Sequence, residues 1–113
     1  MTDAPIGIFD SGYGGLTVAR AVLDQLPHEK IIYLGDTARA PYGPRPIAQT
    51  RTFALECLDR LVDHGVKILV IACNTIAAVA GQKIRQKAGN MPVLDVISAG
   101  AEAALQTTKV LLP

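Results

Sequence analysis

The run VKILVIACNT, residues 66–75, decides the fold that the sequence predicts. Residues 66–72 are almost wholly apolar, which is typical of a parallel strand covered on both faces of its sheet. The polar residues Cys73-Asn74-Thr75 follow, and an amphipathic segment then extends to about Lys87. A buried strand that passes through a short polar junction into a helix is the repeating unit of α/β folds.

The same alternation extends to both sides of this run. Short apolar runs predict strands, and apolar residues at helical spacing predict helices. Strands are expected at residues 6–9, 31–34 and 93–97, and helices at 16–26, 46–64 and 99–107. Residues 109–113 resemble the opening of a fifth strand. We therefore expect one domain spanning residues 1–113, an α/β fold with an open parallel sheet and helices on both faces.

Composition excludes several classes of function. Half of the 113 residues are hydrophobic, and the formal net charge is +1 with no run of Lys or Arg. This balance gives no electrostatic basis for binding nucleic acid or an anionic membrane. No apolar stretch approaches the roughly 18 residues of a membrane span, and no secretory signal is recognisable. The two cysteines are therefore expected to be reduced thiols in the cytoplasm.

Polar residues terminate three of the predicted strands, where open α/β sheets bind ligands. Cys73 precedes a helix, whose N-terminal N–H groups favour a thiolate that could act as nucleophile or proton acceptor. Asn74 and Thr75 at the same terminus could hold a carboxylate. A buried structural cysteine with a polar helix cap remains the alternative. Asp10-Ser11 could contact a substrate ammonium and carboxylate, or could cap the turn and helix that follow.

Other polar residues have weaker functional signals. Asp36-Thr37 could contact a ligand or organise the proline-rich loop that follows, and the backbone N–H groups of Tyr42 and Gly43 in that loop could bind an anion. Cys57 lies on the apolar stripe of its helix, which indicates a core residue. His28 and His64 have no partner at metal-ligand spacing, so no metal site is expected.

The glycine-rich turn after the first strand raises the alternative of a dinucleotide site. Gly12 and Gly14 fit the start of that fingerprint, but Thr17 stands where its third glycine belongs. No Gly-Lys-Ser/Thr sequence is present, so a P-loop is excluded. We therefore expect no nucleotide cofactor.

Taken together, these residues resemble a known family. GIFDSG at residues 7–12 with GGLT at 14–17, YLGDTAR at 33–39 with PYG at 41–43, and VIACNT at 70–75 are similar, in order and spacing, to the motifs of bacterial glutamate racemases. The similarity extends from about Pro5 to Thr108. Each motif is weak alone, but the set is specific.

The resemblance implies a cofactor-independent isomerase that interconverts L- and D-glutamate and supplies D-glutamate for peptidoglycan. In this family two cysteines face opposite sides of the substrate α-carbon. Cys73 matches the first, and Asp10 matches a residue that assists proton transfer or holds the ammonium. The matches to substrate-binding positions are Asp10, Ser11, Tyr42, Gly43, Asn74 and Thr75. A homodimer is compatible with this assignment.

The sequence departs from the family in one respect. Members are roughly twice as long, and their second α/β domain carries the second cysteine in a Gly-Cys-Thr-His block that these 113 residues lack. We therefore expect an incomplete N-terminal domain of a two-domain racemase, a truncated half that does not racemise glutamate alone. The alternatives are an inactive remnant or small-molecule binding module, a sister enzyme such as aspartate racemase, and the dinucleotide-binding domain.

Overall fold

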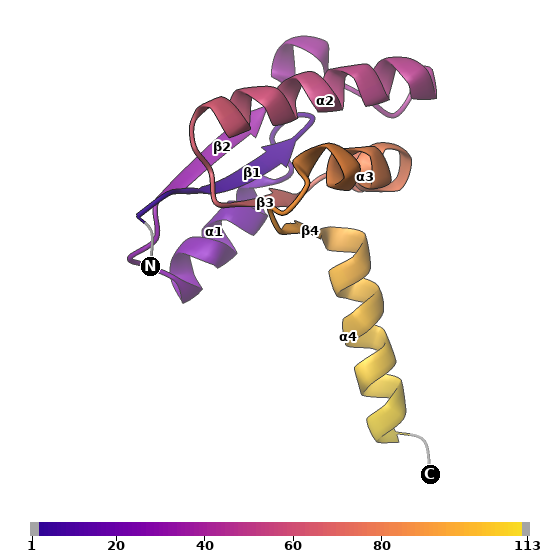
Figure 1. The fold of residues 1–113 in the computed structure, drawn as a ribbon. Coiled ribbons are helices and arrows are strands. Elements are labelled where there is room, and N and C mark those ends of the chain that lie inside the picture. The colour runs from indigo at the N-terminus through magenta and orange to yellow at the C-terminus, as the bar shows by residue number, and fades with distance from the viewer. Residues whose placement is uncertain (1–2, 112–113) are drawn as a thin grey trace.

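Four parallel strands form one open sheet in the order β2-β1-β3-β4 (Figure 1). The computed structural model describes residues 3–111, with side chains for 3–99 and 101–107. The strands are β1 (Ile6–Asp10), β2 (Ile31–Gly35), β3 (Ile68–Ile71) and β4 (Val93–Asp95). The helices are α1 (Leu16–Gln25), the short 3-10 helix η1 (Thr37–Arg39), α2 (Ile47–Asp63), α3 (Asn74–Ala88) and α4 (Val96–Leu111). The predicted fold class is confirmed.

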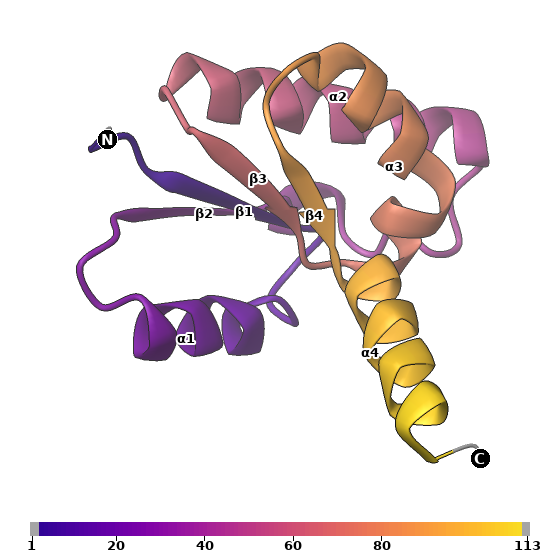
Figure 2. The same ribbon diagram turned by 60° about the horizontal axis from the view of Figure 1, so that its bottom comes forward.

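Helices cover both faces of the sheet, as the sequence predicts (Figure 2). The α2 and α3 helices pack on one face, where they form the main apolar core with β1 and β3. The α1 helix lies on the opposite face and packs through Ala19 against Ile6 and Ile8. Strand β1 is buried along its whole length because it has a strand on each side and helices above and below.

Cover on the α1 face is thinner than the sequence predicts. Leu69 and Ile71 of β3 are fully buried under α2 and α3, but Ile68 and Val70 on the other face are only partly buried. Leu94 of β4 is 55% exposed. The expectation that residues 66–72 are covered on both faces is therefore correct for one face only, because α1 packs over the β1–β2 side of the sheet.

The C-terminal elements also differ from the prediction. Strand β4 ends at Asp95 rather than at residue 97, because the Asp95 carboxylate accepts hydrogen bonds from the N–H and hydroxyl of Ser98 and thereby caps α4. Helix α4 then continues to Leu111, where a fifth strand was expected. A helix satisfies its own backbone hydrogen bonds, whereas a strand needs a neighbour. The end of that expected strand, residues 112 and 113, lies outside the described residues.

Helix α4 extends away from the sheet in both views (Figures 1 and 2). Its main contacts with the rest of the fold are to α3 and β4. Within residues 3–111, no helix combines the length and apolarity that crossing a membrane would require.

Candidate active site

The carboxyl ends of β1 and β3 bring three of the predicted site residues to one edge of the sheet. The two strands are parallel neighbours, with Phe9 paired to Ile71, so the residues that follow each strand meet. Ser11 Oγ lies 3.4 Å from Cys73 Sγ, and Asp10 directly precedes Ser11. The structure therefore places Asp10, Ser11 and Cys73 in one cluster.

The Asp10 carboxylate is buried and held in one orientation. Its Oδ1 accepts the N–H of Ser11 at 2.8 Å, and its Oδ2 accepts the N–H of Gly15 at 2.6 Å. A Cβ at Gly15 would lie only 2.9 Å from Ala72 Cβ and 3.0 Å from Asp10 Cβ. The glycine-rich turn thus serves to bring a backbone N–H onto a buried carboxylate of its own chain.

Tyr33 is a further member of the cluster that sequence reasoning missed. Its hydroxyl lies 3.1 Å from Asp10 Oδ2 and 2.9 Å from the carbonyl oxygen of Gly12, and donates to these acceptors. Burial, together with the hydrogen bond to Asp10, raises the pKa of Tyr33 to about 12, so the phenol remains a donor at neutral pH. No local pattern in the sequence indicates this role, because Tyr33 reaches Asp10 only through the pairing of β2 with β1. In the register of that pairing, Tyr33 lies opposite Ile8.

Cys73 is 9% exposed and lies directly before α3 in extended backbone. The N–H of Ala77 bonds to the Cys73 carbonyl at 3.0 Å, so the thiol lies at the start of the helix, where the helix dipole favours negative charge. Within the described side chains, no hydrogen bond involves those of Asn74 or Thr75. Both residues lie in the first turn of α3, where backbone N–H groups attract anions.

The loop that carries Gly43 lies against the same helix terminus. A Cβ added to Gly43 would be 3.9 Å from Thr75 Oγ1, which is ordinary contact distance. Gly43 itself is exposed, and the peptide bond between Ala40 and Pro41 at the start of the loop is cis. The predicted substrate-binding residues of this loop are thus adjacent to those of α3.

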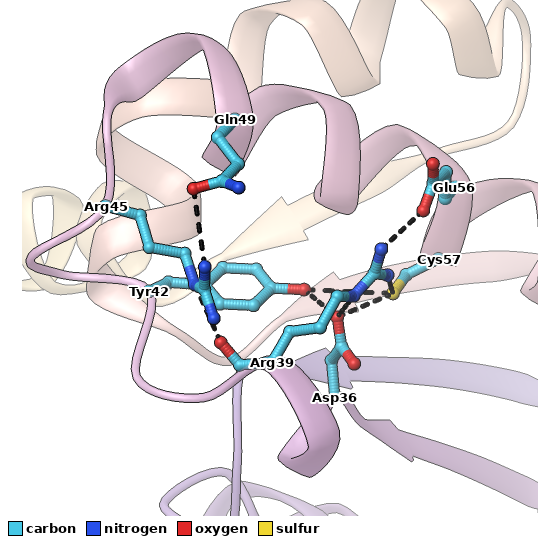
Figure 3. A network of polar contacts seen from close by, with 7 residues as sticks. All are labelled: Asp36, Arg39, Tyr42, Arg45, Gln49, Glu56 and Cys57. Carbon is cyan, nitrogen blue, oxygen red and sulfur yellow. Dashed lines mark hydrogen bonds and ion pairs between the residues drawn. The ribbon is translucent and has the colours of Figure 1, made fainter.

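The Tyr42 side chain points toward Asp36 and Cys57 and helps to hold the loop in place (Figure 3). Its side chain is 1% exposed, and its hydroxyl donates to Asp36, which also accepts a hydrogen bond from Arg39 Nε at 2.6 Å. Burial and the hydrogen bond to Asp36 raise the pKa of Tyr42 well above its usual value. Asp36 therefore organises the proline-rich loop, and Tyr42 can offer a ligand only its backbone.

Cys57 is a core residue, as predicted, with polar neighbours that the sequence did not reveal. Its side chain is 3% exposed and belongs to the main core, while its Sγ lies 3.8 Å from Asp36 Oδ2 and 3.7 Å from Arg39. Burial and the charge of Asp36 raise the pKa of this thiol, so it is a poor nucleophile. Among the described residues, no group of three His, Cys, Asp or Glu side chains could hold a metal ion.

Comparison with known proteins supports a relation to amino-acid racemases. The family model described as Asp/Glu/Hydantoin racemase matches residues 15–112. The chain is 67% identical over 105 residues to a glutamate racemase of Neisseria meningitidis, covering 93% of this chain and 39% of the relative. It is 60% identical over 111 residues to a glutamate racemase of Beutenbergia cavernae, covering 96% of this chain and 38% of the relative.

Solved structures show the same similarity. The glutamate racemase of Francisella tularensis in complex with D-glutamate superposes with a TM-score of 0.87 at 46% identity, over 89% of this chain and 38% of that one. The glutamate racemase of Thermus thermophilus in complex with beta-chloro-D-alanine gives a TM-score of 0.85 at 47% identity, over 90% of this chain and 40% of that one. The chain thus spans about two fifths of the length of the relatives it matches.

Proposed function

The chain belongs to the Asp/Glu/hydantoin racemase family, and we propose that it supplies one side of a glutamate racemase active site, the side that carries Cys73. The observation that carries the proposal is the cluster at the ends of β1 and β3, where Ser11 Oγ lies 3.4 Å from Cys73 Sγ beside the fixed carboxylate of Asp10. This edge is also where open parallel sheets bind ligands.

In the proposed reaction the Cys73 thiolate takes the α-proton of glutamate. The S–H bond forms as the Cα–H bond breaks, and the electron pair remains on the substrate, where fixed dipoles stabilise it. Inversion then requires an acid that delivers a proton to the opposite face. Cys57 cannot be that acid, because its side chain on α2 is buried in the main core beside Asp36. We propose that it is a second cysteine outside these 113 residues.

The other residues of the cluster are proposed to position the substrate. Asn74 and Thr75 at the start of α3, with the backbone of Tyr42 and Gly43, would hold the carboxylates, because helix termini and backbone N–H groups bind anions. Ser11 would donate to the same substrate. Asp10 would accept the substrate ammonium or assist proton transfer, since its orientation is already set by Gly15 and Tyr33.

The wider context is proposed on the same basis. Residues 1–113 would form the N-terminal α/β domain of the racemase, with glutamate as its substrate. The enzyme would be located in the cytoplasm and would supply D-glutamate for peptidoglycan synthesis. No cofactor is needed for proton transfer by thiols. A homodimer is the proposed assembly.

A chimera tests the proposed function directly. The chain is joined in frame to the portion of the Neisseria meningitidis relative that the match does not cover, and loss of optical rotation from L-glutamate is measured. The chimera should racemise glutamate, its Cys73→Ser variant should lose activity by at least about 1,000-fold, and Cys57→Ser should retain most of it. A Cys73→Ser chimera with undiminished activity would refute the assignment, and racemisation by the 113-residue chain alone would refute the need for a second cysteine.

A further inference from the structure

A cavity of about 560 Å³ lies between the end of β2, η1 and α2, and shares no lining residue with the Cys73 cluster. Its volume falls within the roughly 300–1,000 Å³ that is typical of small-molecule sites. None of the residues proposed to touch glutamate lines it. The lining residues are Leu34, Gly35, Asp36, Thr37, Ala38, Arg39, Glu56, Cys57, Asp59 and Arg60.

Most of the charged side chains that line this cavity are already paired with a side chain of opposite charge. The Arg39 guanidinium is shared between Asp36 and Glu56, and Asp59 pairs with Lys87 at 2.9 Å (Figure 3 shows the Arg39 contacts). Arg60 has no ion pair or side-chain hydrogen bond to any other described residue. The cavity therefore presents one uncompensated cation, Arg60, one helical turn from a half-exposed carboxylate, Glu56.

We propose that this cavity binds a small zwitterion of the amino-acid class, with its carboxylate on Arg60 and its ammonium on Glu56. Residues four apart on a helix have Cβ atoms about 5–6 Å apart, so their charged ends can bracket a ligand that carries both charges on one carbon. A simple anion would meet three carboxylates in the wall, and a simple cation would meet two guanidinium groups. A zwitterion satisfies both signs.

The cavity shares a wall with the loop that reaches the Cys73 cluster. Asp36 lines the cavity and accepts the hydroxyl of Tyr42, and the adjacent Gly43 lies against Thr75. Arg39 donates hydrogen bonds to both Glu56 and Asp36. A ligand ammonium on Glu56 would compete with Arg39 for that carboxylate and so alter the contact between Arg39 and Asp36. Occupancy of the cavity is therefore expected to reach the backbone of Tyr42 and Gly43.

The test is a titration of the full chain followed by amide ¹H–¹⁵N NMR shifts, with three probes of similar size. L-alanine carries both charges, propionate only the carboxylate and ethylammonium only the ammonium. L-alanine should give saturable shifts in residues 37–39 and 56–60, with smaller shifts at Tyr42 and Gly43 and a dissociation constant in the millimolar range. The other two probes should bind at least about tenfold more weakly, because each lacks one charge-assisted contact.

Variants separate this site from the proposed glutamate site. Arg60→Gln and Glu56→Gln should each weaken the binding of L-alanine by about tenfold. Arg20→Gln, which removes one member of an exposed ion pair on α1, should leave this binding unchanged. Three outcomes would overturn the proposal: equal binding of propionate and L-alanine, shifts confined to residues 10–12 and 73–75, or no saturable shift. The NMR titration does not measure racemisation. Its result therefore remains interpretable even if the proposed racemase function is refuted.

Discussion

Ser11 Oγ and Cys73 Sγ lie 3.4 Å apart, although 62 residues separate them along the chain. Parallel pairing of β1 with β3 creates this contact, because it places the ends of both strands at one edge of the sheet. The same pairing places Asp10, which directly precedes Ser11, at this edge of the sheet. Both thiols border the main apolar core, but Cys73 contacts a hydroxyl at the sheet edge, whereas Cys57 lies beside the charged pair of Asp36 and Arg39.

The first prediction concerns the two thiols. Iodoacetamide should alkylate Cys73 at least about tenfold faster than Cys57, since reactivity follows thiolate fraction and access, and burial raises the pKa of Cys57. Peptide mass mapping at short labelling times measures both sites in one sample. The Cys73→Ser variant should then label slowly, and preferential labelling of Cys57 in the folded chain would contradict the assignment.

The second prediction concerns the hydroxyl of Tyr33. Tyr33→Phe removes one donor shared by Asp10 and Gly12, and should lower the free energy of unfolding by about 1–2 kcal/mol. Tyr13→Phe is the matched control, because Tyr13 is 73% exposed and should change stability by less than about 0.5 kcal/mol. Urea denaturation followed by circular dichroism measures both, and equal effects would show that the Tyr33 hydrogen bonds are unimportant.

The third prediction compares two glycines. Gly15→Ala places a methyl group 2.9 Å from Ala72 Cβ and against Asp10, and should destabilise the chain by about 1–3 kcal/mol. Gly81→Ala within α3 meets only Arg85 Nη1, at 3.3 Å on a long side chain that can shift, and should stabilise the chain by up to about 1 kcal/mol. Thermal melts of the two variants should therefore shift in opposite directions; a shift in the same direction would show that packing around Gly15 adapts.

The fourth prediction concerns the Tyr42–Asp36 contact. Tyr42→Phe and Asp36→Ala should each destabilise the chain by about 1–3 kcal/mol, because the first removes one of the donors to Asp36 and the second removes the carboxylate that accepts the buried Tyr42 hydroxyl. The double variant should lose less than the sum of the two, by at least about 0.5 kcal/mol. Denaturant titrations of the four proteins complete the cycle. Simple additivity would mean that the two residues do not stabilise the loop through each other.

The fifth prediction concerns pH and Asp95. Burial opposes ionisation of this carboxyl, but the hydrogen bonds from Ser98 and the nearby Arg85 outweigh it and lower its pKa in the folded chain. Because the pKa of Asp95 is lower in the folded chain than its unfolded value of about 3.9, ionised Asp95 stabilises the fold at any pH above that unfolded value. This stabilisation is lost as the pH falls through the pKa of Asp95 in the folded chain.

Asp95→Asn should therefore cost about 1–2 kcal/mol at pH 7, most of it from the Ser98 contacts, since Arg85 is 42% exposed and screened by solvent. The difference between the two proteins should shrink below about pH 4. Stability measured by urea denaturation across pH 3–7 checks this; a difference that does not change with pH would exclude ionisation of Asp95 as its source.

Sequence alone determined the order of the elements and the edge of the sheet at which Asp10 and Cys73 lie. Apolar periodicity is a local property, and the short junctions after each strand follow from it. The motifs also identified the family. The ends of the elements depend on side-chain contacts as well: the predicted strand over residues 93–97 ends at Asp95, because a side-chain cap that involves Ser98 begins the next helix.

Only the tertiary structure decided what surrounds each polar group. The hydrogen bond from Tyr33 to Asp10 joins neighbouring strands, and the contact of Asp36 with Cys57 joins a loop to a helix 21 residues away. Such contacts depend on register and packing, which bring together residues that no periodicity relates. Periodicity therefore fixes the scaffold, whereas the partners of its polar side chains depend on how the completed sheet and helices pack.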